Sequence, residues 1–282
     1  MRHLFSVMAI SFLLVLTALA QSPPPQAANY RLVWSDTFSA LSLCTTDVAG
    51  CNWYNPGVWW LPAGGIITDP SDTYVNLQWY SGQANANSTN IATTSWTGTH
   101  YRAWTYGYFE FSAAFDVVTG SFPAIYMVPE PEVGANTASD GVYYGELDVM
   151  EWQSQTPTKY YGTIHVWKNQ SDVANTNCCD TFSLPTGADL STYNTYGVLW
   201  TPTSISWYFN NLLMGTMDTT ASPYSLTFGG QQPYFIIMSQ QAGCNWTTPC
   251  PGQVNPTNMR VQWVHVYAPV PAPPTQLTVK VQ

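Results

Sequence analysis

The chain has 282 residues, of which only 7 are Lys or Arg against 16 Asp or Glu, and its net charge is -9. A phosphate backbone or an anionic membrane surface requires clustered cations, so we expect neither nucleic acid nor a membrane as a partner. Charged residues make up 8% of the chain and aromatic residues 15%. Aromatic rings on a weakly charged, amide-rich surface are typical of an extracellular protein that binds a neutral carbohydrate.

Residues 1–20 have the pattern of a signal peptide. Arg2 and His3 supply a positive start, residues 4–16 are apolar, and small residues surround the cleavage site that we predict after Ala20. The apolar stretch is shorter than the roughly 20 residues that cross a bilayer, so we expect a secreted protein rather than an anchored one. Three triplets match the N-glycosylation pattern and matter only in a eukaryotic host, at Asn87, Asn169 and Asn245.

The remainder of the chain is typical of one all-β domain. Residues 21–28 are rich in Pro and predict an extended linker, residues 29–268 form the domain, and residues 269–282 form a second Pro-rich tail. Within the domain Gly, Pro and Asn recur at short intervals, and no amphipathic helical pattern is sustained. Alternating apolar residues, as in Phe109, Phe111, Ala113 and Phe115, predict strands with one buried face. We therefore expect a two-sheet β-sandwich.

Six cysteines in an exported chain indicate disulfides, and six allow 15 pairings. Two pairs would each close a short loop: Cys44 with Cys51, and Cys244 with Cys250. A bond between the adjacent Cys178 and Cys179 would be strained, so their state stays open. A metal site is the weaker interpretation, because no metal-ligand spacing accompanies the cysteines, and we expect no cofactor.

Residues 145–152 carry three acids on a strand that is otherwise apolar. Successive side chains of a strand point to opposite faces, so Glu146 and Asp148 share one face and Glu151 falls on the other. A β-bulge around residues 149–150 would return Glu151 to the face of the first two acids, and bulges are common beside active sites. The sequence therefore predicts a bulged strand that presents three carboxyl groups together.

Such a cluster suits glycoside hydrolysis with retention. Four residue spacings separate the two Glu backbones by about 13 Å, and long side chains that lean together would bring the carboxyl groups to the ~5.5 Å of retaining enzymes. The acids could instead be ordinary ion-pair partners. This alternative is weak, because the mature chain offers only six basic residues to its acids. Asp148 between the two Glu would couple their titrations.

The next predicted strand repeats the division of faces. Thr163, His165 and Trp167 share one face, while Ile164 and Val166 share the other. We expect His165 on the polar face to bind a sugar or a carboxylate, although a single His is more often structural.

At these residues the chain resembles glycoside hydrolase family 16, in particular its laminarinase-like branch of endo-β-1,3-glucanases. Eight segments match that family's pattern in order, including its Glu-x-Asp-x-x-Glu strand and its Thr-x-His. The matching segments are Leu32–Phe38, Tyr106–Ala113, Phe122–Pro129, Glu146–Glu151, Thr163–His165, Tyr196–Tyr208, Pro233–Trp246 and Met259–Tyr267.

The resemblance implies a β-jelly roll of the concanavalin A-like type with a sugar-binding cleft across its concave sheet. It also implies that Glu146 is the nucleophile, Asp148 the assisting acid and Glu151 the general acid/base. Further side chains that we expect to line the cleft are His165, Tyr126, Trp152, Trp246 and Trp96. Some family members bind a structural calcium, but no motif here indicates one, and we expect a monomer whose partner is a polysaccharide.

The departures from the family pattern concern specificity. Phe122 and Tyr126 stand where the family usually has Trp, and Gln262 stands where Asp is common. The substrate therefore stays open between β-1,3-glucan, mixed-linkage β-glucan and an agar-type or other β-galactan. A transglycosylase would use the same residues, and a non-catalytic carbohydrate-binding sandwich would be expected to lack one of the three acids.

Overall fold

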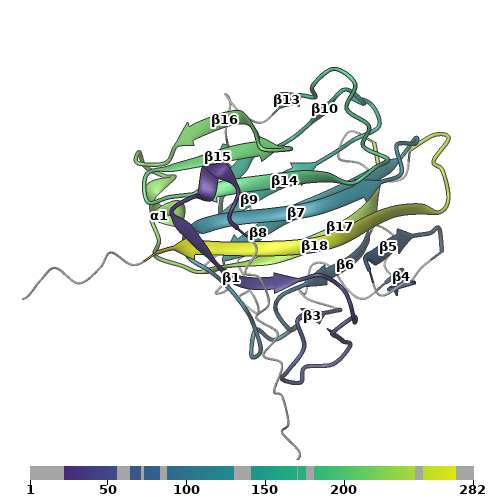
Figure 1. The fold of residues 1–282 in the computed structure, drawn as a ribbon, viewed down its shortest axis with the longest axis horizontal. Helices are drawn as coiled ribbons and strands as arrows, with labels where there is room; N and C mark the ends of the chain where they lie inside the picture. The colour runs from purple at the N-terminus through teal and green to yellow at the C-terminus, as the bar shows by residue number, and fades with distance from the viewer. Residues whose placement is uncertain are drawn as a thin grey trace, which may run out of the picture.

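The computed structural model describes residues 22–55, 64–70, 73–82, 88–129, 141–169, 171–175, 181–244 and 250–270. Two large β-sheets pack face to face, with strands of one sheet in front of the other (Figure 1). The predicted all-β sandwich is therefore confirmed. Among the described residues, no helix is both long and apolar enough to span a membrane.

The first sheet has eight strands, and β7 and β18 lie at its centre. In spatial order it consists of β16 (Leu212–Asp218), β15 (Ser204–Phe209), β14 (Asn194–Trp200), β7 (Gly107–Phe115), β18 (Thr257–Pro269), β5 (Val75–Trp79) and β4 (Ile66–Thr68), with β1 (Tyr30–Asp36) paired to β18.

The second sheet also has eight strands and carries the carboxylate strand near one edge. Its order is β12 (Ser171–Asn175), β11 (Ile164–Lys168), β9 (Tyr143–Glu151), β8 (Ser121–Pro129), β17 (Tyr234–Ala242), β6 (Ser88–Ala92), β3 (Trp53–Tyr54) and β2 (Leu43–Cys44). A short ladder and two single turns complete the described elements: β10 (Lys159–Tyr160) with β13 (Phe182–Ser183), the 3-10 turn η1 (Pro25–Ala27) and α1 (Ser225–Phe228).

The hydrophobic core fills the space between the two sheets. Phe109, Phe111, Ala113 and Phe115 of β7 are all fully buried in it, as their alternation predicted. Side chains of β9 and β11 close the core from the second sheet, so the opposite face of that sheet is left for a cleft.

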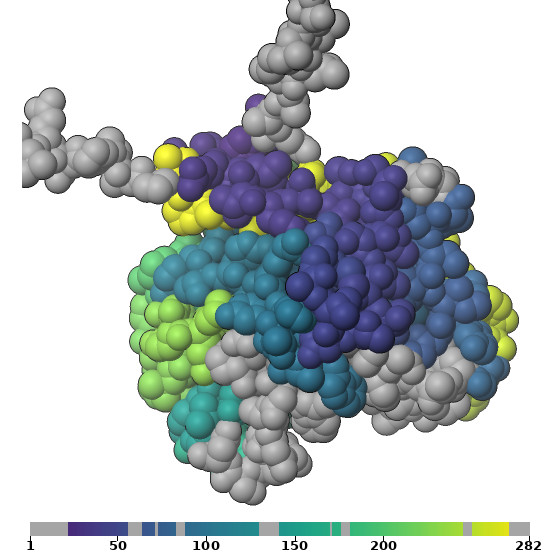
Figure 2. Space-filling model, turned by 90° about the horizontal axis from the view of Figure 1, so that it is seen from below, coloured from purple at the N-terminus to yellow at the C-terminus, as the bar shows by residue number. Residues whose placement is uncertain are grey.

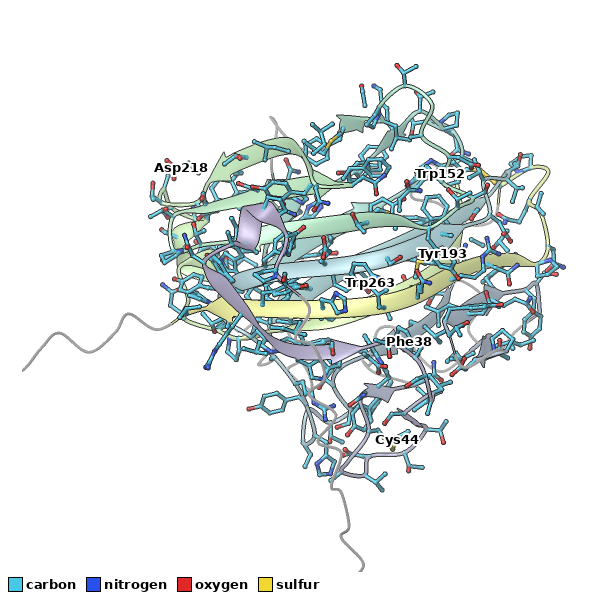
Figure 3. The ribbon with its side chains drawn as sticks, in the orientation of Figure 1. Phe38, Cys44, Trp152, Tyr193, Asp218 and Trp263 are labelled. Carbon is cyan, nitrogen blue, oxygen red and sulfur yellow. A yellow bond between two sulfur atoms is a disulfide. The ribbon has the colours of Figure 1, made fainter. Side chains whose placement is uncertain are left out.

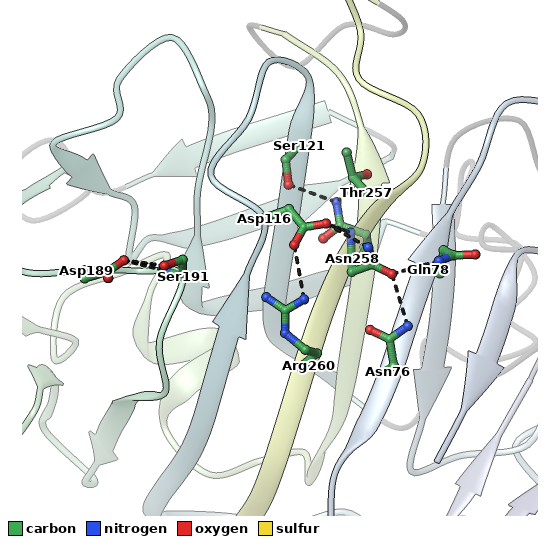
Figure 4. Close-up of polar contacts among 10 residues, drawn as sticks. Asn76, Gln78, Asp116, Ser121, Asp189, Ser191, Thr257, Asn258 and Arg260 are labelled. Atoms are coloured by element: carbon green, nitrogen blue, oxygen red, sulfur yellow. Dashed lines mark hydrogen bonds and ion pairs between the residues drawn. The ribbon is translucent and has the colours of Figure 1, made fainter. Parts of the chain in front are cut away.

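A polar network covers part of the outer face of the first sheet. Arg260 forms an ion pair with Asp116 at 3.1 Å, and Asn258 donates to the same carboxylate (Figure 4). The Asn258 side-chain oxygen in turn accepts from Asn76 and Gln78 of β5. These contacts fix three neighbouring strands on the face that lies away from the carboxylates.

The prediction of an extended linker at residues 21–28 is wrong for residues 25–28. Pro25–Ala27 forms a 3-10 turn, and Ala27 is fully buried against Tyr108 and Tyr267. The side chain of Gln26 also donates to the Tyr108 hydroxyl at 2.5 Å. A Pro at the first position suits such a turn, and Ala is small enough to pack between two Tyr rings, so the domain begins earlier than the composition indicated. The predicted signal peptide lies outside the described residues.

Two of the disulfides are as predicted, Cys44 with Cys51 and Cys244 with Cys250. The first closes a loop whose residue Asp47 accepts from Thr97 and lies 3.9 Å from His100. In the space-filling view these early residues, in purple to dark blue, lie against the teal residues near position 100 (Figure 2). Cys178 and Cys179 lie outside the described residues.

Candidate active site

Strand β9 contains the predicted bulge. His165 of β11 pairs with Glu146, and on the other side Tyr126 of β8 pairs with Asp148. The next pair joins Ile125 to Met150, which leaves Val149 without a partner on β8. Both Val149 and Met150 therefore point into the core, and Glu151 returns to the face of the other two acids. The prediction from the acid spacing is confirmed in its position and its effect.

Strand β11 supplies a hydrogen-bond donor to the first carboxylate. The indole N–H of Trp167 donates to Oε2 of Glu146 at 2.6 Å. Trp167 also stacks on His165, with ring centroids 5.7 Å apart. The sequence grouped Trp167 with His165 on one strand face, but no role was expected of it.

His165 lies between two carboxylates. Its Nε2 is 3.4 Å from Oδ2 of Asp148, and its Nδ1 is 2.8 Å from Oδ2 of Asp172. Asn175 donates to the same oxygen of Asp172 at 3.1 Å. The expected contact of His165 with a carboxylate is therefore observed, and its contact with a sugar stays a prediction. Asp172 and Asn175 come from β12 and were not predicted, because their approach depends on a second bulge, between the β11–β12 pairs at Val166 and Trp167.

Burial and mutual repulsion raise the pKa values of all three acids. The pKa of Glu146 rises to about 8, chiefly through burial and then through the charge of Asp148, while His165 and the Trp167 N–H act in the opposite direction. Burial also raises the pKa of Asp148. The pKa of Glu151 lies well above its ordinary value, through burial and through the charges of Asp148 and Glu146. Burial and two neighbouring acids thus both favour the protonated form of Glu151.

The same charges act on His165 in the other direction. Burial alone would lower its pKa, but hydrogen bonding and attraction to Asp148, with smaller contributions from Glu146 and Asp172, raise it to about 10. His165 is thus a cation at neutral pH and compensates part of the negative charge of the acids.

A cleft of about 430 Å³ opens over these groups. Its lining includes both Glu residues and, from β11 and β12, His165, Trp167 and Asn175. Tyr161 and Thr163 complete the lining, and the backbones of Tyr161 and Glu151 are hydrogen-bonded to each other in both directions. The structure thus places both carboxyl groups at one cleft, and their roles as nucleophile and acid stay a prediction.

Tyr126 lies beside the acids, since it pairs with Asp148 and shares its face of the sheet. It is 7% exposed and packs with Phe122 and Phe235 in a small apolar cluster on that face. Contact of Tyr126 with a sugar stays a prediction.

The prediction that Trp152 lines the cleft is wrong. Trp152 is 1% exposed and packs in the core, with its ring 5.3 Å from that of Phe115, and it is labelled in Figure 3. The reason is the alternation after the bulge: Glu151 regains the cleft face, so the next residue must point inward.

The other two predicted rings are those of Trp96 and Trp246. Trp96 is 41% exposed on a turn after β6, and it is not among the residues that line the cleft over the acids. Trp246 lies outside the described residues. Within the described ranges, no group of three or more His, Cys, Asp or Glu side chains is arranged to hold a metal ion.

Known proteins similar to this chain match it at 25% to 32% identity. A keratan-sulfate endo-1,4-β-galactosidase of Sphingobacterium multivorum is 32% identical over 163 residues, which is 58% of this chain and 37% of that protein. An endo-1,3-1,4-β-glycanase of Rhizobium meliloti is 25% identical over 265 residues, 83% of this chain and 51% of that protein. A β-glucanase of Rhodothermus marinus is 25% identical, with 92% of each chain covered. The chain thus spans about half or less of the first two relatives.

Solved structures agree with the fold. The laminarinase catalytic domain of Thermotoga maritima has a TM-score of 0.61 at 21% identity, over 85% of this chain and 98% of that one. An endo-β-galactosidase of Clostridium perfringens has a TM-score of 0.66 at 19% identity, over 89% of this chain and 66% of that one. The model of the family described as "Glycosyl hydrolases family 16" matches residues 71–265. With the bulged carboxylate strand in its cleft, this chain belongs to glycosyl hydrolase family 16.

Proposed function

We propose that the protein is a secreted retaining endo-glycosidase that hydrolyses a β-linked polysaccharide, with β-1,3- or β-1,3-1,4-glucan as its substrate. The observation that carries the proposal is the bulge in β9, which brings Glu146, Asp148 and Glu151 to one face beneath an open cleft. The glucan is supported by the names of the relatives from Rhizobium meliloti and Rhodothermus marinus.

The reaction would proceed by double displacement. A carboxylate oxygen of Glu146 attacks the anomeric carbon, the glycosidic bond breaks, and Glu151 donates its proton to the leaving oxygen. Glu151 then accepts a proton from a water molecule, whose oxygen attacks the same carbon and releases Glu146. The two carboxyl groups supply all of this chemistry, so the proposed reaction uses no cofactor.

The surroundings of the two Glu residues support this division of roles. Glu146 has a donor in Trp167 and a cation in His165, and both favour its ionised form. Burial, and then the repulsion of Asp148 and Glu146, favour the protonated form of Glu151, against the opposite effect of His165. A nucleophile must be ionised while its partner is protonated, so the environment matches the assignment of each residue.

A β-galactan is the second candidate substrate. It is favoured by the 32% identity with the endo-β-galactosidase and by Phe122 and Tyr126 at positions where the family usually has Trp. Smaller rings in the cleft would offer less stacking area to the flat face of a glucosyl unit.

Two alternatives of other classes remain as outcomes of the test. A non-catalytic carbohydrate-binding protein would have no use for three acids whose pKa values burial raises, because their burial destabilises the fold. A transglycosylase would form the same intermediate and pass the sugar to another hydroxyl group instead of water.

The deciding experiment is reducing-sugar release by the mature chain from laminarin, lichenan, agarose and galactan, with Glu146→Gln in parallel. Cleavage of one polysaccharide by the wild type alone would support the proposal and name the substrate. Binding without cleavage by both proteins would support the binding protein instead. Proton NMR of the first product separates retention from inversion, and azide should rescue Glu146→Ala with inversion of the product.

We further propose that the protein acts outside the cell as a monomer. The pattern of residues 1–20 and the two disulfides support export, because disulfides persist in oxidising compartments. Detection of the mature chain in culture medium, and its mass in solution, would test these two points.

A further inference from the structure

Trp167 occupies a position that the proposed mechanism has not yet used. It is half-buried on β11, lines the cleft, and donates its indole N–H to Oε2 of Glu146 at 2.6 Å. This is the short distance expected when the acceptor is a carboxylate. Oε2 is thus the oxygen of Glu146 that Trp167 holds, and the carboxyl group of Asp148 is a further hydrogen-bonding neighbour of Glu146.

The neighbouring residues hold the indole ring in place. Trp167 follows His165 by two residues on the same strand face, and the two rings are nearly parallel, with an angle of 27° between them. His165 is itself fixed by Asp172 at 2.8 Å and by Asp148 at 3.4 Å. The direction of the Trp167 N–H bond is therefore set by a chain of contacts that begins on β12.

We propose that Trp167 is the positioning residue of the nucleophile, and that its N–H holds one oxygen of Glu146 so that the other faces the anomeric carbon. The inference rests on the proposed double displacement, and it adds a residue that acts through Glu146 rather than on the sugar. An indole N–H is a donor only, so it can serve an ionised carboxylate but cannot itself take a proton.

The hydrogen bond would act in both steps of the reaction. In the first step the other oxygen of Glu146, Oε1, forms the bond to the anomeric carbon, and Oε2 becomes the carbonyl oxygen of the ester. In the second step the bond between sugar and Glu146 breaks and its electron pair returns to the carboxylate, whose charge the N–H again stabilises. Loss of the donor should therefore slow both steps.

Trp167 also distinguishes the two Glu residues. Its N–H is one of the contacts that lower the pKa of Glu146, whereas Trp167 is not among the groups that act on Glu151, whose pKa is lowered by the charge of His165. Removing the N–H should raise the pKa of Glu146 toward that of Glu151 and narrow the pH range in which one is ionised and the other protonated.

The test is Trp167→Phe, which keeps an aromatic ring beside His165 and removes the donor. The substrate is the 2,4-dinitrophenyl β-glycoside of an oligosaccharide from the polysaccharide that the wild type cleaves. Its leaving group, 2,4-dinitrophenolate, needs no proton from Glu151. We expect kcat to fall by about tenfold or more, with little change in KM. The acid limb of the pH profile should move to higher pH, since the nucleophile then ionises later. An acid limb at the wild-type position would overturn the inference.

Trp263→Phe is the matched control. Trp263 also stacks on a His two residues away on its strand, with 4.1 Å between the ring centroids of Trp263 and His265. It lies on β18 in the other sheet, on the face turned toward the viewer in Figure 3. This variant should leave kcat and the acid limb unchanged. An equal shift in both variants would mean that the effect is general and would overturn the role of Trp167.

A second measurement separates this inference from the proposed function. Carbon NMR of Glu labelled at the side-chain carboxyl group, with Glu146→Gln to assign the signal, gives the pKa of Glu146 without any substrate. If no glycan is cleaved but the Glu146 signal titrates at higher pH in Trp167→Phe, the proposed function fails and the action of Trp167 on Glu146 stands. If the signal titrates at the same pH in both proteins, the inference fails whatever the activity.

Discussion

Trp207 donates its indole N–H to the backbone carbonyl oxygen of Asp148 at 2.7 Å, from one sheet of the sandwich to the other. Trp207 is fully buried on β15, and Asp148 directly precedes the unpaired residue of the bulge in β9. Gly162 makes room for this contact, because a Cβ there would lie 2.5 Å from the Trp207 ring. The conformation that brings the acids together is thus tied to the core behind it.

Trp207→Phe should therefore weaken both stability and activity. The buried carbonyl of Asp148 would lose its donor, at a cost of about 1–3 kcal/mol in the free energy of unfolding. The bulge would also be less firmly held, so kcat/KM per folded molecule should fall. Urea unfolding and polysaccharide cleavage on the same preparation give the two quantities.

The neighbouring strand offers a control for that variant. Trp200 of β14 is also fully buried and donates to the backbone carbonyl of Phe228 at 2.9 Å, away from the bulge. Trp200→Phe should cost a similar amount of stability and leave kcat/KM of the folded protein unchanged. Equal losses of activity in both variants would show that the contact to Asp148 has no special role.

The pH profile of activity should be bell-shaped, with its maximum at a higher pH than two ordinary carboxyl groups would give. The acid limb follows ionisation of Glu146, whose pKa rises from 4.5 to about 8, and the alkaline limb follows loss of the Glu151 proton, whose pKa is also raised. A profile of kcat/KM against pH checks this expectation. An acid limb at or below pH 4.5 would contradict the burial of the pair.

The pKa values of two histidines should be shifted in opposite directions. The attraction of Asp148 and its neighbours raises the pKa of His165 to about 10, whereas burial lowers the pKa of His265 to about 4. At pH 6.5 the first should be doubly protonated and the second neutral. Nitrogen NMR of the imidazole rings distinguishes these forms directly, with His165→Asn and His265→Asn to assign the signals. A neutral His165 at that pH would remove the cation that compensates the acids.

The stability that His165 contributes follows from the same shift. A folded pKa above the unfolded value of 6.5 means that the contribution is complete below pH 6.5 and is lost as the pH rises through about 10. The difference in unfolding free energy between wild type and His165→Asn should therefore shrink between these values. A difference that stays constant to pH 10 would contradict the ion pairs.

The alternation of polar and apolar residues was enough to predict the central strands. It assigned the faces of β7 and β11, and the odd spacing between Asp148 and Glu151 required a bulge where one is found. These features are local, since each depends on residues within one strand. The three acids on one face repel one another, and no Lys or Arg lies near them in the sequence to compensate their charge. A functional role for the acids could therefore be inferred.

Other features depend on contacts between distant segments. Asp172 reaches His165 only because of a bulge between β11 and β12, and nothing in the sequence of β12 indicates one. The burial of Ala27 depends on Tyr108 and Tyr267, which are far away in the chain. The prediction for Trp152 was wrong for a different reason. The bulge shifts the alternation of every residue that follows it, so Trp152 points into the core once Glu151 faces the cleft.

Glu151→Gln should stabilise the folded protein while it abolishes turnover of natural substrates. The pKa of Glu151 in the folded state lies above its unfolded value, so the charged form destabilises the fold. This cost is absent below about pH 4.3 and grows as the pH rises toward the folded pKa. The amide has nearly the same shape without the charge, so we expect a gain on the order of 1 kcal/mol at pH 7. Thermal unfolding from pH 4 to pH 8 measures it.

An exposed acid of opposite behaviour provides the control. Hydrogen bonds from Ser191 lower the pKa of Asp189, so its carboxylate contributes stability above its unfolded pKa, and this is lost as the pH falls through the folded value. Asp189→Asn should therefore lower the melting temperature at pH 7, whereas Glu151→Gln raises it. If Glu151→Gln were also less stable at pH 7, the charge of Glu151 would be compensated in the folded state. Glu151 would then not hold its proton at neutral pH, and its role as general acid would be contradicted.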